Sequence, residues 1–476
     1  MPNLADFLAA VKDASCPPGA QSVAFESVST DSRSIQSKGL FVALGGPNFD
    51  GHEFLAMAQQ KGAAAAIVSR SDLAPIHGLP LVQVPDTLLA LQQWATAHRD
   101  QWHGPLVAVT GSNGKTTVKQ MISAIAMQAF GEAQTWATPG NLNNHIGVPL
   151  SVLGLLPSHR FAVLELGMNH PGEIAGLAAI AKPSVGLINN AQREHQEFMK
   201  SVEAVAQENG QVLASLPATG VAVFPRDPDH EMIWRAQAGS RRMIRFGFRD
   251  APAAPQYAGE ELLGEWIFAA SGTRTLSVMF PDQQTITISP KGAGQHFALN
   301  LLASAASAWA SGVTAEAIEL ALNRFTPVKG RGLQLALSGG GVVIDDTYNA
   351  NPDSVRAAID ALVSMPQPQM LVLGDMGEVG DQGDAFHDEV LHYAADQKIE
   401  SLWLHGHAMA QASSRTKIGL YQESLPQLIA MLQTAIRQAQ HDQQQPSVWV
   451  KGSRFMRMER VVDALIHPTG DPAPCC

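Results

Sequence analysis

Residues 107–117 read Val-Ala-Val-Thr-Gly-Ser-Asn-Gly-Lys-Thr-Thr, and this stretch decides the fold of the region around it. Its apolar start predicts a buried strand, and apolar residues at helical spacing predict a helix directly behind it: Val118, Met121, Ile122 and Ile125. In a strand, glycine loop and helix of this kind, backbone N–H groups and the helix N-terminus face one anion. The stretch therefore predicts a phosphate-binding loop.

The residue types in this loop indicate a site for a triphosphate with Mg²⁺. Lys115 can reach the terminal phosphates, and the hydroxyl of Thr116 is an oxygen of the kind that binds Mg²⁺. The loop departs from the usual G-x-x-x-x-G-K-[ST] pattern, because Val109 stands five positions before Gly114. A structural turn with a chance lysine is the alternative. We predict that the following residues bind the nucleotide: Gly111, Ser112, Asn113, Gly114, Lys115, Thr116 and Thr117.

Apolar segments of strand length recur after the loop. Those at 161–164, 185–188 and 221–224 are separated by helix-length stretches, which is typical of a parallel sheet covered on both faces. Between residues 265 and 288 the pattern alternates, and an alanine-rich helix is expected at 300–311. A third series of strands is expected near the end of the chain, at 342–344, 371–373, 402–404 and 448–450.

The length of 476 residues favours about three domains. Before the phosphate loop, a strand is expected at 41–44 and a helix at 56–66, and Asp86 is expected to cap a new helix. We predict an α/β protein of three domains. They are a small N-terminal α/β domain (1–85), a central parallel-sheet domain with the phosphate loop (86–327) and a C-terminal Rossmann-like α/β domain (328–476).

Composition excludes several classes of protein. Hydrophobic residues make up 45% of the chain and charged residues 16%, which excludes a disordered or fibrous chain. The net charge of −11 disfavours a surface for nucleic acid or for an anionic membrane. No segment has the length of a membrane span, and the three cysteines have no metal-ligand spacing. We expect a cytoplasmic protein.

Polar residues at predicted strand ends and in one loop are further candidates. Glu165 ends the strand at 161–164, where a carboxylate can reach the Mg²⁺ of the loop, and a solvated surface carboxylate is the alternative. His195 follows the next strand and can ligate a divalent ion, although a lone histidine is more often structural. The stretch 140–149 is rich in glycine and asparagine and is typical of a binding loop. In the C-terminal region the strand ends carry a polar rim: Asp345, Asp346, Asp375, Gly406 and Lys451.

Taken together, the motifs resemble those of the ATP-dependent Mur ligases. They run from the STDSRSI region to residue 453 and include TGSNGKTT, GNLNNHIGVPLSVL, ELGMNHPGEI, GQHFALNLLASAA, KGRG, IDDTYNANPDS, LGDMGEVGD and VKGSR. The resemblance implies three domains, which bind in turn a UDP-sugar-peptide, ATP and the incoming amine. It further implies that D-alanyl-D-alanine is joined to UDP-N-acetylmuramoyl-tripeptide through an acyl phosphate, with release of ADP and phosphate.

The resemblance also implies roles for individual residues. Lys115, Glu165, His195 and Arg331 would be catalytic, and Thr116, Glu165 and His195 would bind Mg²⁺. Further ATP contacts would come from Asn300, Arg331, Asp346, Tyr348 and Asn349. The UDP substrate would be bound by Ser29, Thr30, Asp31, Ser32, Arg33, Gly46, Asp50, His52, Asn141, Asn143 and Asn144.

The chain departs from the family pattern at two places. Where many relatives carry a carbamylated lysine that supports a second Mg²⁺, residues 206–210 read Ala-Gln-Glu-Asn-Gly. No carbamate can form there, so a second metal would need Gln207, Glu208 or another oxygen ligand. Phe297 stands where an asparagine usually follows the histidine of the adenine motif, so that hydrogen bond cannot be made.

Three alternatives stay open beside this interpretation. The chain could be a sister ligase that adds another amino acid or extends folate, a mechanochemical phosphate-loop ATPase, or a nucleotide-binding scaffold without activity. The sequence does not distinguish diaminopimelate from lysine as the third residue of the peptide. We expect a monomer whose partners are its small-molecule substrates, and neither nucleic acid nor membrane.

Overall fold

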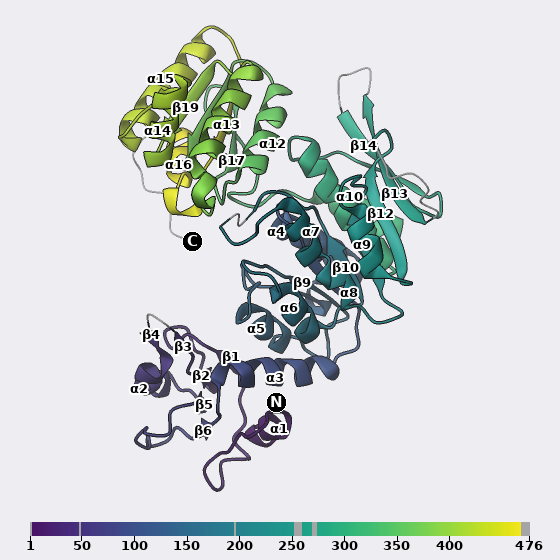
Figure 1. Cartoon of the computed structure of the whole chain (residues 1–476), viewed down its shortest axis with the longest axis vertical. Coiled ribbons are helices and arrows are strands. Elements are labelled where there is room, and N and C mark those ends of the chain that lie inside the picture. The colour runs from purple at the N-terminus through teal and green to yellow at the C-terminus, as the bar shows by residue number, and fades with distance from the viewer. Residues whose placement is uncertain (1, 47–48, 195–196, 252–258, 269–273, 468–476) are drawn as a thin grey trace.

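The computed structural model describes residues 2–46, 49–194, 197–251, 259–268 and 274–467. Three larger sheets follow one another along the chain, and a short pair of strands, β3 and β4, lies between strands of the first. The N-terminal and C-terminal elements lie at opposite ends of the molecule's long axis, with the phosphate-loop sheet adjoining both (Figure 1). Within the described residues, no helix has the length and apolar character needed to cross a bilayer.

The N-terminal region is built on a four-stranded parallel sheet of order β1-β2-β5-β6. The expected helix at 56–66 is too long, because Gly62, with φ +88°, lies between the end of α2 and the start of β5. The alanine run is ambiguous in sequence, and its second half is a buried strand. The elements are α1 (Leu4–Ala10), β1 (Ser27–Ser29), β2 (Gly39–Val42), β3 (Gly45–Gly46), β4 (Phe49–Asp50), η1 (Gly51–Phe54), α2 (Leu55–Gln60), β5 (Ala65–Val68) and β6 (Leu81–Gln83).

Helix α3 (Thr87–Asp100) connects this region to the next sheet. The carboxylate of Asp86 accepts hydrogen bonds from the backbone N–H groups of Leu88 and Leu89, which confirms the predicted cap. The apolar face of α3 contributes Trp94 to the N-terminal core and Ala95 to the core of the following sheet. One helix therefore packs into both cores.

The central sheet has nine strands in the order β15-β14-β13-β12-β11-β10-β7-β9-β8. The predicted strands β9, β10 and β11 are parallel as expected, and β7, β8, β12 and β13 run in the same direction. The strands β14 and β15 extend the same sheet in antiparallel pairing. Their bounds are β7 (Leu106–Thr110), β8 (Thr135–Ala137), β9 (Phe161–Glu165), β10 (Val185–Ile188), β11 (Val221–Pro225), β12 (Arg242–Phe248), β13 (Glu260–Phe268), β14 (Arg274–Met279) and β15 (Thr285–Ile288).

Helices cover both faces of the central sheet, as expected for apolar strands without alternation. One face packs against α4 (Lys115–Phe130), α10 (Gln295–Ala310) and α11 (Ala315–Arg324). The other packs against α5 (Gly147–Leu153), α6 (Glu173–Ala181), α7 (Val202–Asn209), α8 (Gln211–Ala214) and α9 (Glu231–Ala238).

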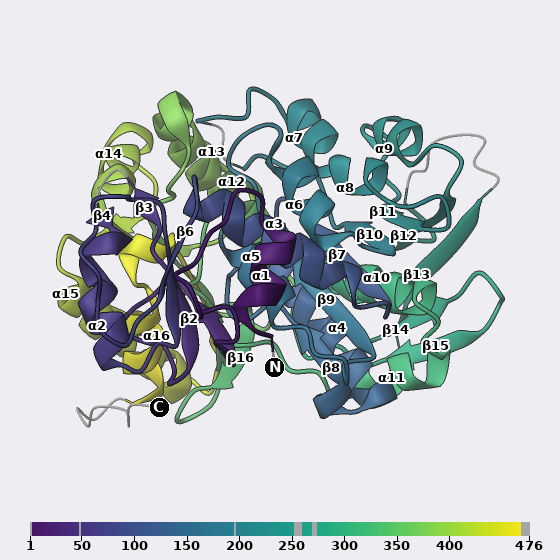
Figure 2. The same cartoon turned by 90° about the horizontal axis from the view of Figure 1, so that it is seen from below.

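The C-terminal sheet has the order β16-β17-β21-β18-β19-β20 and is parallel apart from its edge strand β16. Its faces are covered by α12 to α14 and by α15 and α16 (Figure 2). The bounds are β16 (Leu333–Ala336), β17 (Val342–Asp346), α12 (Pro352–Val363), β18 (Gln369–Gly374), α13 (Gly383–Asp396), β19 (Ser401–His405), α14 (His407–Thr416), β20 (Leu420–Tyr421), α15 (Leu425–His441), β21 (Ser447–Lys451) and α16 (Glu459–Ile466).

The predicted polar rim is present at the carboxyl ends of these parallel strands. Asp346 ends β17 and Lys451 ends β21, while Asp375 and Gly406 directly follow β18 and β19. The domain boundaries at residues 85 and 327 fall in the connections between sheets and stay a prediction.

Candidate active site

The phosphate loop runs from the end of β7 to the start of α4. Gly111 and Gly114 have φ values of +127° and +81°, which strongly favour glycine. A Cβ on Gly114 would lie 2.5 Å from Oδ1 of Asn300 and 2.7 Å from Nδ2 of Asn189. The loop therefore lies directly on these two amides, and glycine is required at position 114 for space as well as for conformation.

Asparagine side chains brace the loop from beneath. Asn189 donates to the carbonyl of Asn113 at 2.7 Å and to Oδ1 of Asn300 at 2.8 Å. Asn190 Oδ1 accepts the N–H of Asn113 at 2.9 Å, and Asn209 Oδ1 accepts that of Gly111 at 2.9 Å. The sequence interpretation assigned no such role to Asn189, Asn190 or Asn209. Asn189 and Asn190 directly follow the predicted strand at 185–188, and this position at a strand end could have identified them as candidates.

The side chain of Lys115 folds back over the phosphate loop. Its Nζ donates to the carbonyls of Gly111 at 2.5 Å and Ser112 at 3.1 Å, and it pairs with Oε2 of Glu194 at 3.2 Å. The cation is thus at the centre of the loop and held by oxygens that an incoming phosphate would replace.

Glu165 lies beside Thr116, as the interpretation of the strand end predicted. The carboxylate is 2% exposed, and its Oε1 accepts from Thr116 Oγ1 at 3.2 Å and from Asn143 Nδ2 at 2.8 Å. Its Oε2 is buried, makes no hydrogen bond and lies 3.7 Å from the ammonium group of Lys119. A buried carboxylate oxygen beside a threonine hydroxyl fits Mg²⁺, which usually takes one or two protein oxygens and completes its shell with water and phosphate.

His195, the third predicted metal ligand, lies outside the described residues. Within those that are described, there is no group of three or more histidine, cysteine and acidic side chains close enough to hold a metal. Thr116 and Glu165 are therefore the protein oxygens on which the magnesium prediction rests.

Lys119 is a functional candidate that the sequence interpretation missed. It is 3% exposed and donates to the carbonyls of Thr138 at 3.0 Å and Gly140 at 2.9 Å. Burial lowers the pKa of its ammonium group, and the charge of Glu165 opposes that shift. A lysine between Val118 and Ile122, on the apolar side of the helix, was the signal in the sequence.

A cavity of about 360 Å³ opens between the phosphate loop, helix α10 and the C-terminal sheet. On the C-terminal side Asp346 accepts from Lys451 at 2.7 Å, so the two ends of β17 and β21 are joined there. Phe297 replaces the expected amide with a buried ring. Predicted nucleotide-binding residues that line this cavity are Asn113, Gly114, Thr117, Asn300, Arg331, Asp346, Tyr348 and Asn349.

A second cavity, of about 500 Å³, lies on the other side of the loop. The guanidinium carbon of Arg331 lies 3.7 Å from the ring centre of Tyr348, and both residues line both cavities. Burial lowers the pKa of Arg331, opposed mainly by the charge of Glu165. Predicted site residues that line the second cavity are Ser112, Asn113, Gly114, Lys115, Thr116, Asn141, Asn143, Asn144, Glu165, Arg331, Tyr348 and Asn349.

The predicted UDP-substrate residues of the N-terminal region lie apart from these cavities, neither of which is lined by any described residue before position 86. Arg33 makes a two-pronged ion pair with Asp31, which lowers the pKa of Asp31 to about 2. Ser29 accepts the N–H of Asp31, Ser32 donates to Met57, and Thr30 completes this turn.

The second predicted UDP loop is held together by its own polar groups. Asp50 Oδ1 lies 2.5 Å from Nδ1 of His52, whose Nε2 accepts the N–H of Ser69 at 3.0 Å. Gly46 pairs with Phe49 in the short β3–β4 ladder. Both ring nitrogens of the buried His52 are thus already hydrogen-bonded.

Gln207 and Glu208, from the segment where relatives carry the carbamylated lysine, lie away from the two cavities. Glu208 accepts the N–H groups of Gly172 at 2.8 Å and Ile174 at 2.9 Å, at the N-terminus of α6. Gln207 is exposed, and neither residue lines the two cavities. Glu208 therefore caps α6, and Gln207 lies on the surface, so neither residue is placed to bind a second metal in these cavities.

A phosphate loop on a parallel sheet, facing a second α/β sheet across two shared cavities, defines a multidomain phosphate-loop nucleotide-binding protein. Models of three Mur ligase regions match the chain: "Mur ligase family, catalytic domain" at residues 24–99, "Mur ligase middle domain" at 109–308, and "Mur ligase, glutamate ligase domain" at 330–454. The chain belongs to the Mur ligase family.

Individual relatives match over almost the whole chain. The UDP-N-acetylmuramoyl-tripeptide--D-alanyl-D-alanine ligase of Escherichia coli is 36% identical over 447 residues, which cover 93% of this chain and 94% of the relative. A crystal structure of MurF from Acinetobacter baumannii has a TM-score of 0.84 at 30% identity and 98% coverage of both chains. MurF from Thermotoga maritima, solved in complex with ADP, has a TM-score of 0.77 at 25% identity, covering 92% of this chain and 97% of that one.

Proposed function

We propose that this chain is the ATP-dependent ligase that joins D-alanyl-D-alanine to UDP-N-acetylmuramoyl-tripeptide in peptidoglycan precursor synthesis. The observation that carries the proposal is the second cavity, where Lys115, Glu165 and Arg331 surround a space large enough for a phosphoryl group and a carboxylate. Relatives of this name, which match 93% and 94% of the chain, support the choice of substrates.

The reaction must activate a carboxylate, because a carboxylate does not react with an amine at neutral pH. A carboxylate oxygen of the tripeptide attacks the γ-phosphorus of ATP, the bond to the β-phosphate oxygen breaks, and ADP leaves. The amine of D-alanyl-D-alanine then attacks the acyl carbon, loses a proton and expels inorganic phosphate. The products are the pentapeptide amide, ADP and phosphate.

Residues of this chain position the groups and neutralise charge during the transfer. Lys115 exchanges its contacts with loop carbonyls and Glu194 for the terminal phosphates, and the half-buried Arg331 faces the phosphoryl group from the C-terminal side. Thr116 and Glu165, with His195, would hold Mg²⁺, which supplies positive charge to the phosphate oxygens. Water has to be excluded while the acyl phosphate exists, and the position of the site between two domains serves this purpose.

The remaining predicted residues would bind the adenosine half of ATP, the peptide, and the UDP end of the second substrate. Asn300, Asp346, Tyr348 and Asn349 would bind the adenosine half of ATP in the first cavity. Asn141, Asn143 and Asn144 would bind the peptide near the carboxylate. The UDP end would lie on the N-terminal domain, against Ser29, Thr30, Asp31, Ser32, Arg33, Gly46, Asp50 and His52.

The chain is proposed to act as a monomer in the cytoplasm, where ATP is available. Lys115, Glu165 and Arg331 come from one chain, so the phosphate site needs no second copy. Light scattering of the purified protein tests the monomer, and a mass near 100 kDa in place of 50.7 kDa would contradict it.

The test of function is ATP-dependent phosphate release with UDP-N-acetylmuramoyl-tripeptide and a series of acceptors. We expect release with D-alanyl-D-alanine and none with single amino acids, together with a pentapeptide product by mass spectrometry. Release with a single amino acid would identify a sister ligase instead. Nucleotide binding without release for any acceptor would favour a scaffold.

A further inference from the structure

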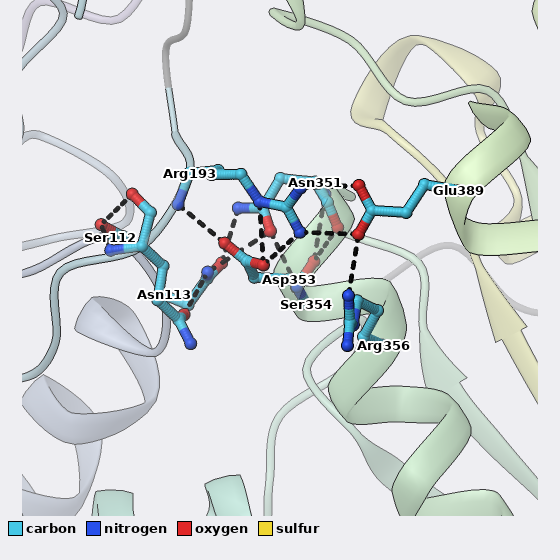
Figure 3. A network of polar contacts seen from close by, with 9 residues as sticks. Ser112, Asn113, Arg193, Asn351, Asp353, Ser354, Arg356 and Glu389 are labelled. Atoms are coloured by element: carbon cyan, nitrogen blue, oxygen red, sulfur yellow. Dashed lines mark hydrogen bonds and ion pairs between the residues drawn. The ribbon is translucent and has the colours of Figure 1, made fainter. Parts of the chain in front are cut away.

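Arg193 joins the central sheet region to the C-terminal domain through a set of ion pairs (Figure 3). It lies in the connection between β10 and α7, and its side chain is 22% exposed. Its Nε and Nη2 donate to Oδ1 of Asp353 at 3.0 and 2.6 Å, and its backbone N–H donates to Oδ2 at 2.8 Å. Its Nη1 and Nη2 donate to the two oxygens of Glu389 at 2.7 and 2.9 Å. One guanidinium thus binds helices α12 and α13 together.

The residue before Arg193 holds the phosphate loop. The backbone N–H of Gln192 donates to Ser112 Oγ at 2.8 Å, and its side-chain oxygen accepts from Asn113 at 2.7 Å. Asn113 in turn accepts from Asn351 at 2.9 Å, directly before α12 (Figure 3). The segment therefore contacts the phosphate loop on one side and the C-terminal domain on the other.

The geometry of the two cavities depends on this connection. Each is lined by the phosphate loop from the central region and by Arg331, Tyr348 and Asn349 from the C-terminal region. A nucleotide that contacts both walls binds only when the walls are at the right separation. If only a fraction of the molecules has that arrangement, the apparent association constant is the intrinsic constant multiplied by that fraction.

The ion pairs of Arg193 have the geometry that makes such a connection specific. Each carboxylate receives at least two N–H groups, and charge-assisted bonds of this kind fix orientation as well as distance. Hydrogen bonds from Arg193 and then Arg356 lower the pKa of Glu389, so the carboxylate is ionised at neutral pH. Arg193 also lies 5.3 Å from the ring centre of Phe386 on α13.

We propose that Arg193 is a positioning residue that keeps the C-terminal domain docked on the phosphate loop and so assembles the nucleotide site before ATP binds. The inference deepens the proposed function and rests on it for the choice of substrates, although the docking itself concerns nucleotide alone. Removing the guanidinium shifts the population to more open arrangements. Nucleotide and substrates then have to restore the closed one.

The main test is Arg193→Met in the full-length protein. We expect the Kd for ADP with Mg²⁺, measured by calorimetry without acceptor, to rise about tenfold. The KM for ATP rises correspondingly while kcat at saturating substrates falls less than threefold. Small-angle scattering shows a larger radius of gyration in the variant without ligand, which returns toward the wild-type value with saturating nucleotide.

A matched control is Arg356→Met. Arg356 donates to the same carboxylate of Glu389 at 2.9 Å, but both residues belong to the C-terminal domain, on α12 and α13. We expect its ADP affinity and radius of gyration to equal those of the wild type. An equal effect of Arg356→Met would overturn the proposal, because packing between α12 and α13 would then explain both variants.

Two more variants keep the proposal testable if Arg193→Met does not fold. Glu389→Gln removes charge from one partner, and Arg193→Lys keeps the charge but cannot bind both carboxylates in the same way. Each is expected to raise the Kd for ADP by a smaller factor, and the effects of Arg193→Met and Glu389→Gln are less than additive.

Other outcomes separate this inference from the proposed function. Unchanged ADP affinity and scattering in Arg193→Met contradict the docking role, and so does a change confined to the KM of the dipeptide, which would indicate a direct substrate contact. If the wild type binds ADP and the variants weaken it, but no acceptor supports ligation, the docking role stands and the proposed function fails.

Discussion

The ammonium group of Lys119 lies 3.7 Å from Oε2 of Glu165, and both side chains are almost completely buried. The lysine also donates to the carbonyls of Thr138 and Gly140, which precede the asparagine-rich loop at 141–144. One cation therefore fixes the start of this loop and lies against the proposed magnesium carboxylate.

Replacement of this cation is expected to destabilise the protein. In Lys119→Met the carboxylate loses its buried partner and two carbonyls lose their donor, which together cost about 3 kcal/mol of unfolding free energy. Urea unfolding measures the loss. The control is Lys182→Met, which removes an exposed pair with Asp100 and is expected to change stability by less than about 1 kcal/mol. Equal stability of Lys119→Met and the wild type would show that the pair contributes nothing.

Lys115→Ala tests the centre of the proposed site. The ammonium group contacts loop carbonyls and Glu194 rather than the core, so its loss is expected to leave the fold intact. Without its charge on the transferring phosphoryl group, phosphate release is expected to fall at least about 100-fold. Circular dichroism verifies the fold of the same sample. Undiminished phosphate release from folded Lys115→Ala would contradict the assignment of the site.

Gly114→Ala is expected to distort the phosphate loop. The new Cβ would lie 2.5 Å from Asn300 Oδ1, and the residue would keep φ near +81°. The affinity for ADP should fall at least about tenfold, because the loop must move off its asparagine supports. Gly312→Ala is the matched control: φ is +86°, but its Cβ meets no atom within 4 Å. It should cost about 1 kcal/mol of stability and no ADP affinity.

The sequence predicts much of the fold because its strongest patterns are local. The strands at 161–164, 185–188 and 221–224 and the phosphate loop between Val107 and Thr117 are apolar runs and turns within short windows. The helix expected at 56–66 is wrong in its second half, because alanine by itself favours a helix, but burial of the run as β5 between β2 and β6 overrides that propensity.

The sequence predicts the residues around the phosphate loop, but not the contacts that hold the C-terminal domain beside it. Lys115, Thr116 and Glu165 follow from a motif and a strand end, and the structure brings them together. Arg193 and its partners Asp353 and Glu389 are separated by 160 and 196 positions, so their pairing depends on how two domains meet. No local pattern carries that information.

His296 is expected to make stability depend on pH. Burial lowers the pKa of its imidazole below the ordinary 6.5, while the charges of Asp346 and Lys451 act in opposite directions. Below about pH 6.5 the imidazole therefore binds a proton in the unfolded chain but not in the folded one, and the free energy of unfolding falls as pH falls. In His296→Gln the slope between pH 7 and 5.5 should be shallower, by at most about 1.4 kcal/mol per pH unit.

Denaturant unfolding at several pH values measures this slope. Gln295→Ala is the control, because it replaces an exposed side chain without a titrating group next to His296 and should leave the slope unchanged. Parallel stability curves for the wild type and His296→Gln would contradict the assignment of a neutral imidazole in the folded protein.

Asn209 belongs to the segment 206–210, where the resemblance leads us to expect a carbamylated lysine, and it supports the phosphate loop. Its Oδ1 accepts the N–H of Gly111 at 2.9 Å, and Asn209 is 1% exposed. In Asn209→Ala this N–H loses its buried acceptor, at a cost of about 1 kcal/mol to the loop conformation that binds phosphate. The Kd for ADP should therefore rise about fivefold. The neighbouring Gln207→Ala changes an exposed side chain and should leave the Kd unchanged. If the two variants bind ADP equally well, Asn209 has no part in shaping the loop.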